Sequence, residues 1–193
     1  MVRFNLVITL LLMINMAVKA ELTNRMFDVR HVGYAEGLSS QRVFSIVEDG
    51  DGAMWIATKT GIDRYNGHTV KNYDLPGSFY YGDLAGRRLY LLSDAQQGLF
   101  AYDHTGRIYR YSTILDHFEQ VLHLGQLIQE EVILNKLCLD SDGTWWMGAD
   151  KGLYKQEADH RIVAVLKGQY VNDIAFAGES LFVGTSNGVW QLS

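Results

Sequence analysis

The stretch Val43–Gly67, VFSIVEDGDGAMWIATKTGIDRYNG, contains the pattern that decides the fold. Two short apolar runs flank Asp49-Gly50-Asp51-Gly52, and Asp and Gly tolerate the positive φ that tight hairpin turns demand. A third run begins after Gly61 and ends at Asn66-Gly67, which is a strong hairpin signal. The stretch therefore predicts short antiparallel strands joined by tight turns.

The same pattern returns further along the chain. It is clear at Leu134–Tyr154, LNKLCLDSDGTWWMGADKGLY, and looser at Leu84–Tyr102 and Val171–Leu192. We take four glycines to open the third strand of each unit, with spacings of 37, 54 and 36 residues: Gly61, Gly98, Gly152 and Gly188. In three units a large aromatic residue lies six positions before that glycine: Trp55, Trp146 and Phe182.

A period near 40 residues with four short strands per unit is typical of a β-propeller blade. One blade is too small to bury both of its faces, so blades stack face to face. We predict an all-β chain of about four blades, each of four antiparallel strands, as part of a larger propeller. The blades are expected at about residues 43–74, 79–111, 134–166 and 171–192.

Turn and interface residues are expected to be structural, because turns need glycine and blade interfaces need large apolar rings. The residues assigned to this blade motif are Asp51, Gly52, Trp55, Gly61, Asp142, Gly143, Trp146, Gly152 and Gly188.

Two segments do not fit the repeat simply. Ser112–Glu131 is compatible with a helix, a strand or a loop, and the pattern does not decide among them. Phe27–Val32 alternates apolar and polar residues, so it predicts a strand. That strand is a candidate for the outer strand missing after Leu192, which would close a ring.

The first residues indicate export. Arg3 precedes an apolar run, Phe4–Val18, and the segment ends at Ala20 in a small-residue pattern. We predict a signal peptide at residues 1–20, a mature propeller segment at 21–193 and a periplasmic location. An uncleaved anchor is the alternative, but the run is shorter than the roughly 20 residues that span a bilayer. No stable membrane span is expected after cleavage.

Charge and cysteine content exclude several classes of function. The net charge of −5 becomes −7 once Arg3 and Lys19 are removed, and an acidic surface argues against nucleic acid as a partner. Cys138 is the single cysteine, so no intrachain disulfide can form. Its apolar neighbours predict a buried, inert thiol.

No catalytic, cofactor or metal site is predicted. The acidic turns resemble the start of a calcium loop, but the twelfth positions, which need a bidentate glutamate, are Thr60 and Lys151. The six histidines form no metal-binding motif, and no nucleophile or phosphate-loop signature is present. Hairpin turns explain these motifs better than calcium does.

A binding surface remains. The innermost strands of a propeller line its central channel, and the loops that lead into them form one mouth of it. The candidate ligand-binding residues are Arg42, Phe44, Asn135, Lys136, Asn172 and Asp173. Their polar groups suit an oligosaccharide, although simple hydration of the channel is the alternative. The aromatic cluster Phe79-Tyr80-Tyr81 suits either sugar stacking or blade packing.

Gly37–Gly67 resembles the two-component regulator propeller repeat. The matching residues include Gly37-Leu38-Ser39-Ser40, Asp49, Trp55-Ile56, Gly61-Ile62 and Arg64-Tyr65-Asn66-Gly67, and Leu134–Tyr154 matches at Asp140, Asp142-Gly143, Trp146, Gly148 and Gly152-Leu153. Such repeats fill the periplasmic sensor region of hybrid two-component histidine kinases of glycan-degrading gut bacteria. The chain carries no kinase or receiver motif.

The resemblance implies a non-enzymatic periplasmic sensor segment for a glycan fragment. Kinase activity would belong to another part of a parent receptor, of which this chain would be an N-terminal fragment. Its partners would be an oligosaccharide and either the remaining propeller blades or a second chain. A secreted propeller scaffold and a propeller lyase or glycosidase are the alternative functions.

Overall fold

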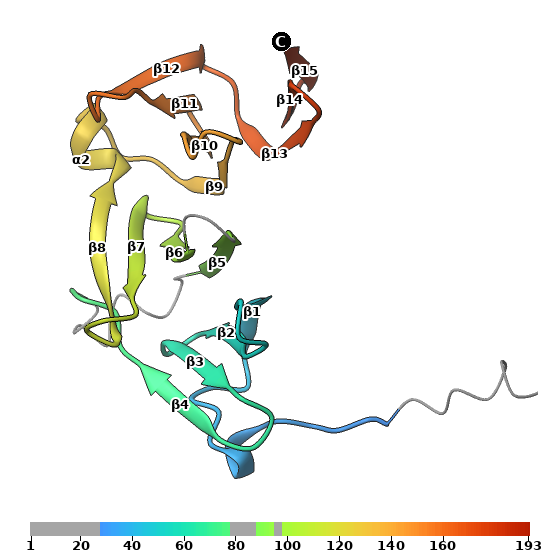
Figure 1. The fold of residues 1–193 in the computed structure, drawn as a ribbon. Helices are drawn as coiled ribbons and strands as arrows, with labels where there is room; N and C mark the ends of the chain where they lie inside the picture. Colours follow the sequence, from blue (N-terminus) through green and yellow to red (C-terminus); the bar gives the residue numbers. More distant parts are fainter. Residues whose placement is uncertain (1–27, 78–87, 95–97) are drawn as a thin grey trace, which may run out of the picture. The chain divides into compact units, whose positions relative to one another are not determined.

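The computed structural model describes residues 28–77, 88–94 and 98–193 (Figure 1). The chain divides into two units, residues 1–31 and 32–193, and every described strand belongs to the second unit. The predicted signal peptide and Phe79-Tyr80-Tyr81 lie outside the described residues. No helix in the described ranges has the length and apolar character needed to cross a membrane.

The second unit consists of four consecutive antiparallel sheets, here called blades 1 to 4. A 3-10 turn, η1 (Tyr34–Glu36), precedes them. Blade 1 contains β1 (Val43–Glu48), β2 (Met54–Thr58), β3 (Ile62–Tyr65) and β4 (Val70–Tyr73). Blade 2 contains β5 (Leu89–Asp94), β6 (Gly98–Asp103), β7 (Arg107–Ser112) and β8 (His117–His123).

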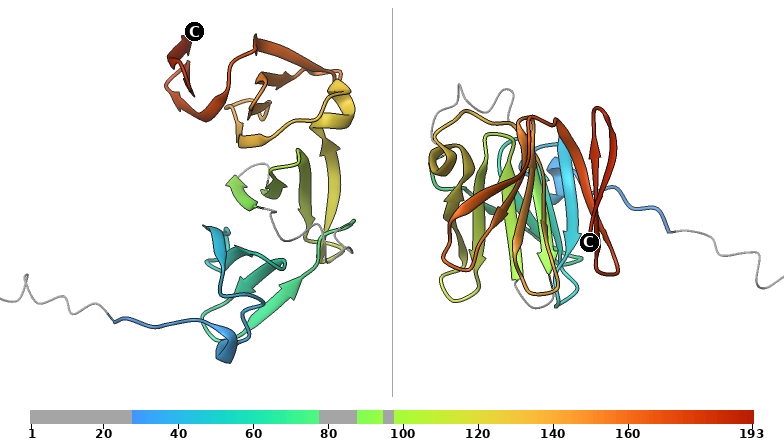
Figure 2. Two further views of the ribbon diagram at one scale, coloured as in Figure 1. Left: turned by 180° about the vertical axis from the view of Figure 1, so that it is seen from behind. Right: turned by 90° about the horizontal axis from the view of Figure 1, so that it is seen from above.

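Blade 3 follows a short helix, α2 (Leu124–Ile128). It contains β9 (Leu134–Leu139), β10 (Trp145–Ala149), β11 (Gly152–Gln156) and β12 (Ile162–Lys167). Blade 4 contains three strands, β13 (Val171–Ala177), β14 (Ser180–Thr185) and β15 (Gly188–Leu192). In every blade the strands are hydrogen-bonded in chain order, and consecutive blades lie face to face (Figure 2). The predicted propeller-blade architecture is confirmed.

The predicted limits of blade 2 were wrong. Its sheet runs from Leu89 to His123, so the segment Ser112–Glu131 supplies its fourth strand, β8, followed by α2. The predicted strand over Asp28–Val32 is also absent, while Phe27 lies outside the described residues. Alternation of apolar and polar residues predicts a strand only where a neighbouring strand is available to pair with it.

Gly98 opens the second strand of blade 2, not the third. The glycine that precedes the third strand is Gly106, and Phe100 lies six positions before it, as Trp55 lies before Gly61. With Gly106 in place, the spacings of these glycines become 45, 46 and 36 residues. The repeat is therefore regular through blade 2, and the apparent 54-residue gap came from aligning the wrong strand.

Asp49 organises the turn between β1 and β2. Its Oδ1 accepts hydrogen bonds from the backbone N–H groups of Asp51 (3.0 Å) and Ala53 (2.9 Å). Its Oδ2 accepts one from the indole Nε1–H of Trp55 (2.8 Å) and an ion-pair contact from Arg64 (3.1 Å). We call this arrangement the Asp–Trp clasp, because one carboxylate fixes both the turn and the interface aromatic.

Blade 3 repeats the clasp. Asp140 Oδ1 accepts from the N–H groups of Asp142 (3.0 Å) and Thr144 (2.9 Å), and its Oδ2 accepts from Trp146 Nε1–H (3.1 Å). Asp51 and Asp142 contribute their backbones, and the Asp51 side chain is 90% exposed. Gly52 and Gly143 follow them with φ of 80° and 78°, a region that side chains with a Cβ rarely adopt.

A cation from the third strand covers the interface aromatic in three blades. Arg64 lies 5.6 Å from the Trp55 ring centroid, Arg110 lies 5.9 Å from that of Phe100, and Lys155 lies 5.3 Å from that of Trp146. Each is the direct cross-strand partner of its aromatic residue. Such contacts contribute about 0.5–1 kcal/mol at exposed sites. Blades 1 to 3 therefore share one cross-strand unit, whereas Gln191 lies opposite Phe182 in blade 4.

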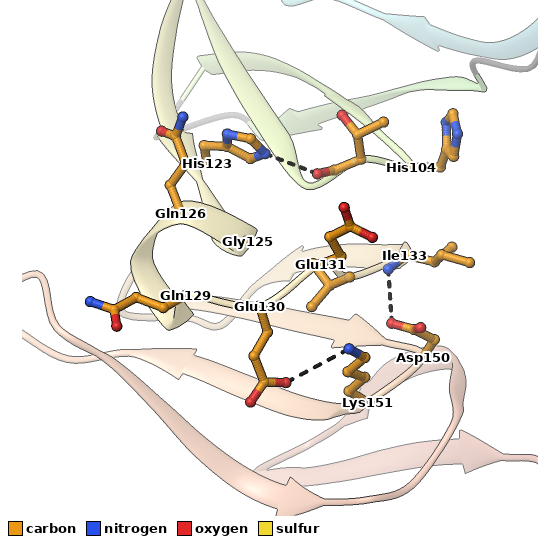
Figure 3. A pocket seen from close by; sticks show the side chains of 12 residues that line it. His104, His123, Gly125, Gln126, Gln129, Glu130, Glu131, Ile133, Asp150 and Lys151 are labelled. Carbon is orange, nitrogen blue, oxygen red and sulfur yellow. Dashed lines mark hydrogen bonds and ion pairs between the residues drawn. The ribbon is translucent and has the colours of Figure 1, made fainter.

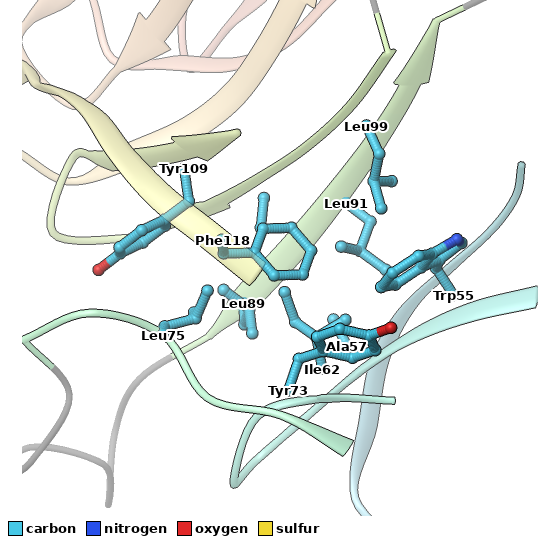
Figure 4. Close-up of a cluster of buried hydrophobic side chains, with 11 residues drawn as sticks. Trp55, Ala57, Ile62, Tyr73, Leu75, Leu89, Leu91, Leu99, Tyr109 and Phe118 are labelled. Carbon is cyan, nitrogen blue, oxygen red and sulfur yellow. The ribbon is translucent and has the colours of Figure 1, made fainter. Parts of the chain in front are cut away.

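Apolar clusters join consecutive blades. Between blades 1 and 2, Trp55 is 1% exposed and packs with Tyr73 and Phe118 at ring-centroid distances of 5.0 and 5.8 Å (Figure 4). The Tyr111 ring lies 4.6 Å from that of Trp55. A second cluster, which includes Met147, joins blades 2 and 3, and a third, which includes Val183, joins blades 3 and 4. No buried cluster among the described residues joins blade 4 to blade 1.

Polar contacts reinforce the first of these interfaces. Asp116, in the β7–β8 turn, accepts hydrogen bonds from Tyr73 (2.8 Å) and Tyr111 (2.7 Å) and pairs with Lys71. Lys71 and Tyr73 belong to blade 1, so a turn of blade 2 is fastened to the outer strand of its neighbour. The hydrogen bond from Lys71, followed by those from the two tyrosines, holds the pKa of Asp116 well below its ordinary value.

The lead-in loop covers the opposite face of blade 1. Ser39 donates its N–H (2.9 Å) and its hydroxyl (2.8 Å) to Asp63, which is fully buried, and Asn72 donates to the other Asp63 oxygen (2.7 Å). Leu38 is buried beside them. The Gly37–Ser40 part of the repeat is therefore a structural cap.

Close backbone approach explains two of the glycines that open third strands. A Cβ on Gly61 would lie 2.8 Å from the Tyr73 carbonyl oxygen, and one on Gly152 would lie 2.3 Å from that of Leu166. Both oxygens belong to the fourth strand of the same blade. Gly188 occupies the same position in blade 4, which has no fourth strand in its sheet.

We expect Asp49→Ala to lower the free energy of unfolding by about 1–3 kcal/mol, because the turn N–H groups and the Trp55 indole lose their acceptor. The matched control is Asp51→Ala in the same turn, which should change it by less than about 0.5 kcal/mol. Chemical unfolding followed by tryptophan fluorescence measures both. Equal effects of the two substitutions would show that the clasp is not the organising contact.

The clasp carboxylates should also make stability depend on pH. Burial raises the pKa of Asp49 and Asp140, but the hydrogen bonds from Trp55 and Ala53, and from Trp146 and Thr144, outweigh it, so both pKa values are lowered. A lowered folded-state pKa gives stability that is present above the unfolded value of 3.8 and is lost as pH falls through the folded value.

Urea unfolding between pH 6 and pH 2 should therefore show a steeper loss for the native chain than for the double variant Asp49→Asn, Asp140→Asn. The double variant Asp51→Asn, Asp142→Asn is the control at the same two turns. If the native chain and the clasp variant lose stability in parallel as the pH falls, the clasp carboxylates are not the source of the pH dependence.

Candidate functional site

The predicted ligand residues lie where three innermost strands begin. In each of three innermost strands the pairing register skips one residue. The skip falls between Val43 and Ser45 in β1, between Leu134 and Lys136 in β9, and between Val171 and Asp173 in β13. Phe44, Asn135 and Asn172 are therefore the extra residues of three β-bulges. A bulge redirects a side chain and often lies beside a functional site, which gives these positions a shared geometric property.

The structure brings together the candidates from blades 3 and 4. Lys136 Nζ lies 3.0 Å from an Asp173 carboxylate oxygen, and Asn135 Nδ2 donates to the Val171 carbonyl oxygen at 2.8 Å. Asn172 is exposed next to Asp173. These contacts join the starts of β9 and β13 into one polar surface, which we call the inner-strand surface.

Arg42 and Phe44 are a separate pair in blade 1. The Arg42 guanidinium lies 5.4 Å from the centroid of the Phe44 ring. Within the described ranges, no hydrogen bond or ion pair connects either residue to the four candidates of blades 3 and 4. In blade 2, β5 and β6 pair without a register shift, so there is no bulge at this position. The Tyr90 ring of β5 instead stacks on the Tyr102 ring of β6, with 5.2 Å between the ring centroids.

A cavity of about 840 Å³ lies between blades 2 and 3 (Figure 3). Its walls come from the β6–β7 turn, the segment from α2 to β9 and the β10–β11 turn. The lining residues are His104, Thr105, His123, Gly125, Gln126, Gln129, Glu130, Glu131, Val132, Ile133, Asp150 and Lys151. We call it the α2 cavity.

Backbone hydrogen bonds fix the walls of the α2 cavity. Leu124 N–H donates to the Gly106 carbonyl (2.8 Å), and Leu134 N–H donates to the His104 carbonyl (2.9 Å). Asp150 N–H donates to Ile133 O (3.0 Å), and Ile133 N–H returns a bond to Asp150 Oδ1 (2.8 Å). Leu124, which is fully buried, anchors the helix in the core, so the cavity is pre-formed.

Carboxylates and amides dominate the chemistry of this cavity. Glu130 lies 3.8 Å from Lys151, and His123 Nε2 contacts the Thr105 carbonyl at 3.1 Å. The Glu131 carboxylate has no hydrogen-bond or ion-pair partner among the described residues, and it points into the cavity in Figure 3. Gln129 ends α2 with φ of 59°, an uncommon conformation for a residue other than glycine.

The described residues offer neither a metal cluster nor a reactive thiol. No group of three or more His, Cys, Asp or Glu side chains in the described ranges has the geometry to hold a metal ion. Burial raises the pKa of the Cys138 thiol to about 12, which makes it a poor nucleophile at neutral pH. The acidic turns, which resemble calcium loops in sequence, are the Asp–Trp clasps described above.

Sequence reasoning missed the α2 cavity and the clasp carboxylates. No sequence motif marks Glu130-Glu131 as part of a site, because the sequence does not show that the Asp150-Lys151 turn lies opposite. Asp49 and Asp140 lay in the quoted motif, and their spacing of six residues before Trp55 and Trp146 was the available signal.

The sheets, the clasps and the stacked interfaces define the class of this protein as a β-propeller. The family model described as two component regulator propeller matches residues 37–60, which confirms the resemblance in the first repeat. A search of curated proteins finds no significant match.

Solved structures show the same fold. Two structures of one extracellular domain from B. thetaiotaomicron, described as a one-component and as a hybrid two-component system, are 19% and 20% identical. The matched regions cover 86% and 88% of this chain but only 23% and 24% of the two solved chains, with TM-scores of 0.67 and 0.65.

The extracellular domain of a second hybrid two-component system from the same organism is 17% identical, covers 85% of this chain and 25% of its own, and has a TM-score of 0.64. Virginiamycin B lyase from Staphylococcus aureus is 15% identical, with 81% and 57% coverage and a TM-score of 0.59. This chain spans about a quarter of the length of the B. thetaiotaomicron domains.

Proposed function

We propose that this chain is an extracellular ligand-sensing propeller segment of a two-component signalling receptor, and that its ligand is a glycan fragment. The observation that carries the proposal is the family match at residues 37–60 within a fold similar to the extracellular domains of two hybrid two-component systems. The proposed segment binds ligand and performs no chemistry. Export by the predicted leader, residues 1–20, would place it in the periplasm.

The inner-strand surface supports glycan as the ligand class. Lys136 and Asp173 offer a donor and an acceptor 3.0 Å apart, and the Asn172 amide beside them can serve as both. Vicinal hydroxyl groups of a sugar are donors and acceptors at similar spacing. Both charged side chains are partly exposed, so a ligand can replace part of their contact with each other.

Signal transfer would need further parts of a receptor. We propose that the face of blade 4 that carries Phe182 packs against a further blade or a second chain, because the corresponding faces of blades 1 to 3 are each covered by the next blade. Val189, in β15, is 72% exposed. A kinase would lie elsewhere in the parent receptor.

Titration calorimetry with a panel of neutral oligosaccharides tests the function. We expect at least one ligand to bind without turnover, and Lys136→Met to weaken that binding about tenfold because a charge-assisted hydrogen bond is lost. Lys167→Met, which changes an exposed lysine at the end of β12, is the control.

Cleavage of a panel member, detected chromatographically, would replace the sensor proposal with a lyase or glycosidase. Absence of binding across the panel would favour a secreted interaction scaffold. Equal binding by the Lys136 and Lys167 variants would locate the glycan away from the inner-strand surface.

A further inference from the structure

We propose that the α2 cavity is a second ligand site, and that it takes a small polyhydroxylated molecule carrying a protonated amine. The site is separate from the inner-strand surface, and its assignment rests on its own volume, walls and charge. A volume of about 840 Å³ lies within the range of small-molecule pockets, roughly 300–1,000 Å³.

The position of the cavity is specific to one blade junction. Ten residues, 124–133, connect β8 to β9, compared with three residues, 168–170, between β12 and β13, and the structure describes the 15-residue connection between β4 and β5 only in part. The 124–133 connection is ordered and forms α2, and Gly125 permits its tight return, because a Cβ there would lie 2.8 Å from the Glu130 carbonyl oxygen. Extra length in an ordered connection is typical of binding loops.

The charge of the lining selects the ligand. Glu130, Glu131 and Asp150 bring three carboxylates, whereas Lys151 is the single lysine and lies next to Glu130. Asp150 already accepts the Ile133 N–H, so Glu131 is the carboxylate most available to a new partner. An ammonium group satisfies this acceptor, and an anionic ligand would meet uncompensated negative charge.

The remaining polar groups suit hydroxyls. The side chains of Gln126 and Gln129 are exposed at the cavity, and an amide both donates and accepts hydrogen bonds. Among the described residues the lining contains no Phe, Tyr or Trp, so the imidazoles of His104 and His123 are its only rings. Recognition therefore depends on polar contacts, with Val132 and Ile133 as the apolar part of the wall.

Three disaccharides of similar size test the charge preference by titration calorimetry on the full chain. They are the β-1,4-linked disaccharide of glucosamine, its N-acetylated neutral form, and a digalacturonate. We expect the amine to bind best and the uronate least. Glu131→Gln keeps the shape of the side chain and should lower affinity for the amine about threefold to tenfold, because one carboxylate–ammonium contact is lost.

Glu179→Gln is the matched control, since Glu179 is an exposed glutamate in the β13–β14 turn. It should leave binding of the amine unchanged, and added salt should weaken binding in the native chain more than in the Glu131 variant. Equal affinity for the amine and neutral forms, no amine binding, or equal behaviour of the two variants would each overturn the site.

The outcome separates this site from the proposed sensor function. Suppose that a neutral glycan binds in a way that depends on Lys136, while the Glu131 substitution does not change binding of the amine. This result would overturn the α2 site and leave the sensor proposal standing. Binding of the amine that depends on Glu131, with no neutral glycan bound, would do the reverse.

Discussion

One carboxylate connects local geometry to tertiary packing in this protein. Asp49 accepts the N–H groups of its own turn, and the same side chain orients Trp55, whose ring lies at the centre of the first blade interface. Because the turn and the ring share one acceptor, the contacts that close the hairpin also hold the aromatic ring toward the next blade. Asp140 and Trp146 repeat this coupling two blades later.

Blades 2 and 4 show how the repeat varies. Phe100 and Phe182 occupy the aromatic position but have no side-chain N–H to donate, so the clasp is confined to blades 1 and 3 among the described residues. Blade 2 retains the cross-strand cation, Arg110, and its turn residue Asp116 fastens it to blade 1. The cation–aromatic pairs and apolar clusters are therefore the more general feature, and the clasp is an addition to them.

The two candidate sites have different origins in the fold. The inner-strand surface comes from bulges that recur in three blades, so it belongs to the repeat itself. The α2 cavity comes from the connection between β8 and β9 and from turns of two neighbouring blades. The bulges of the inner-strand surface recur with the repeat, whereas the α2 connection occurs at one blade junction. The scaffold can therefore place binding groups in both its strands and its loops.

The sequence by itself determined the blade class, because hairpin turns and interface aromatics are local signals. Only the tertiary structure decided that Gly106, not Gly98, precedes the third strand of blade 2, since strand pairing depends on neighbours distant in sequence. It also decided that Glu131 faces a cavity, because Asp150 and Lys151 approach it from another blade. Periodicity specifies which elements form, whereas the facing of side chains across a junction depends on how those elements pack.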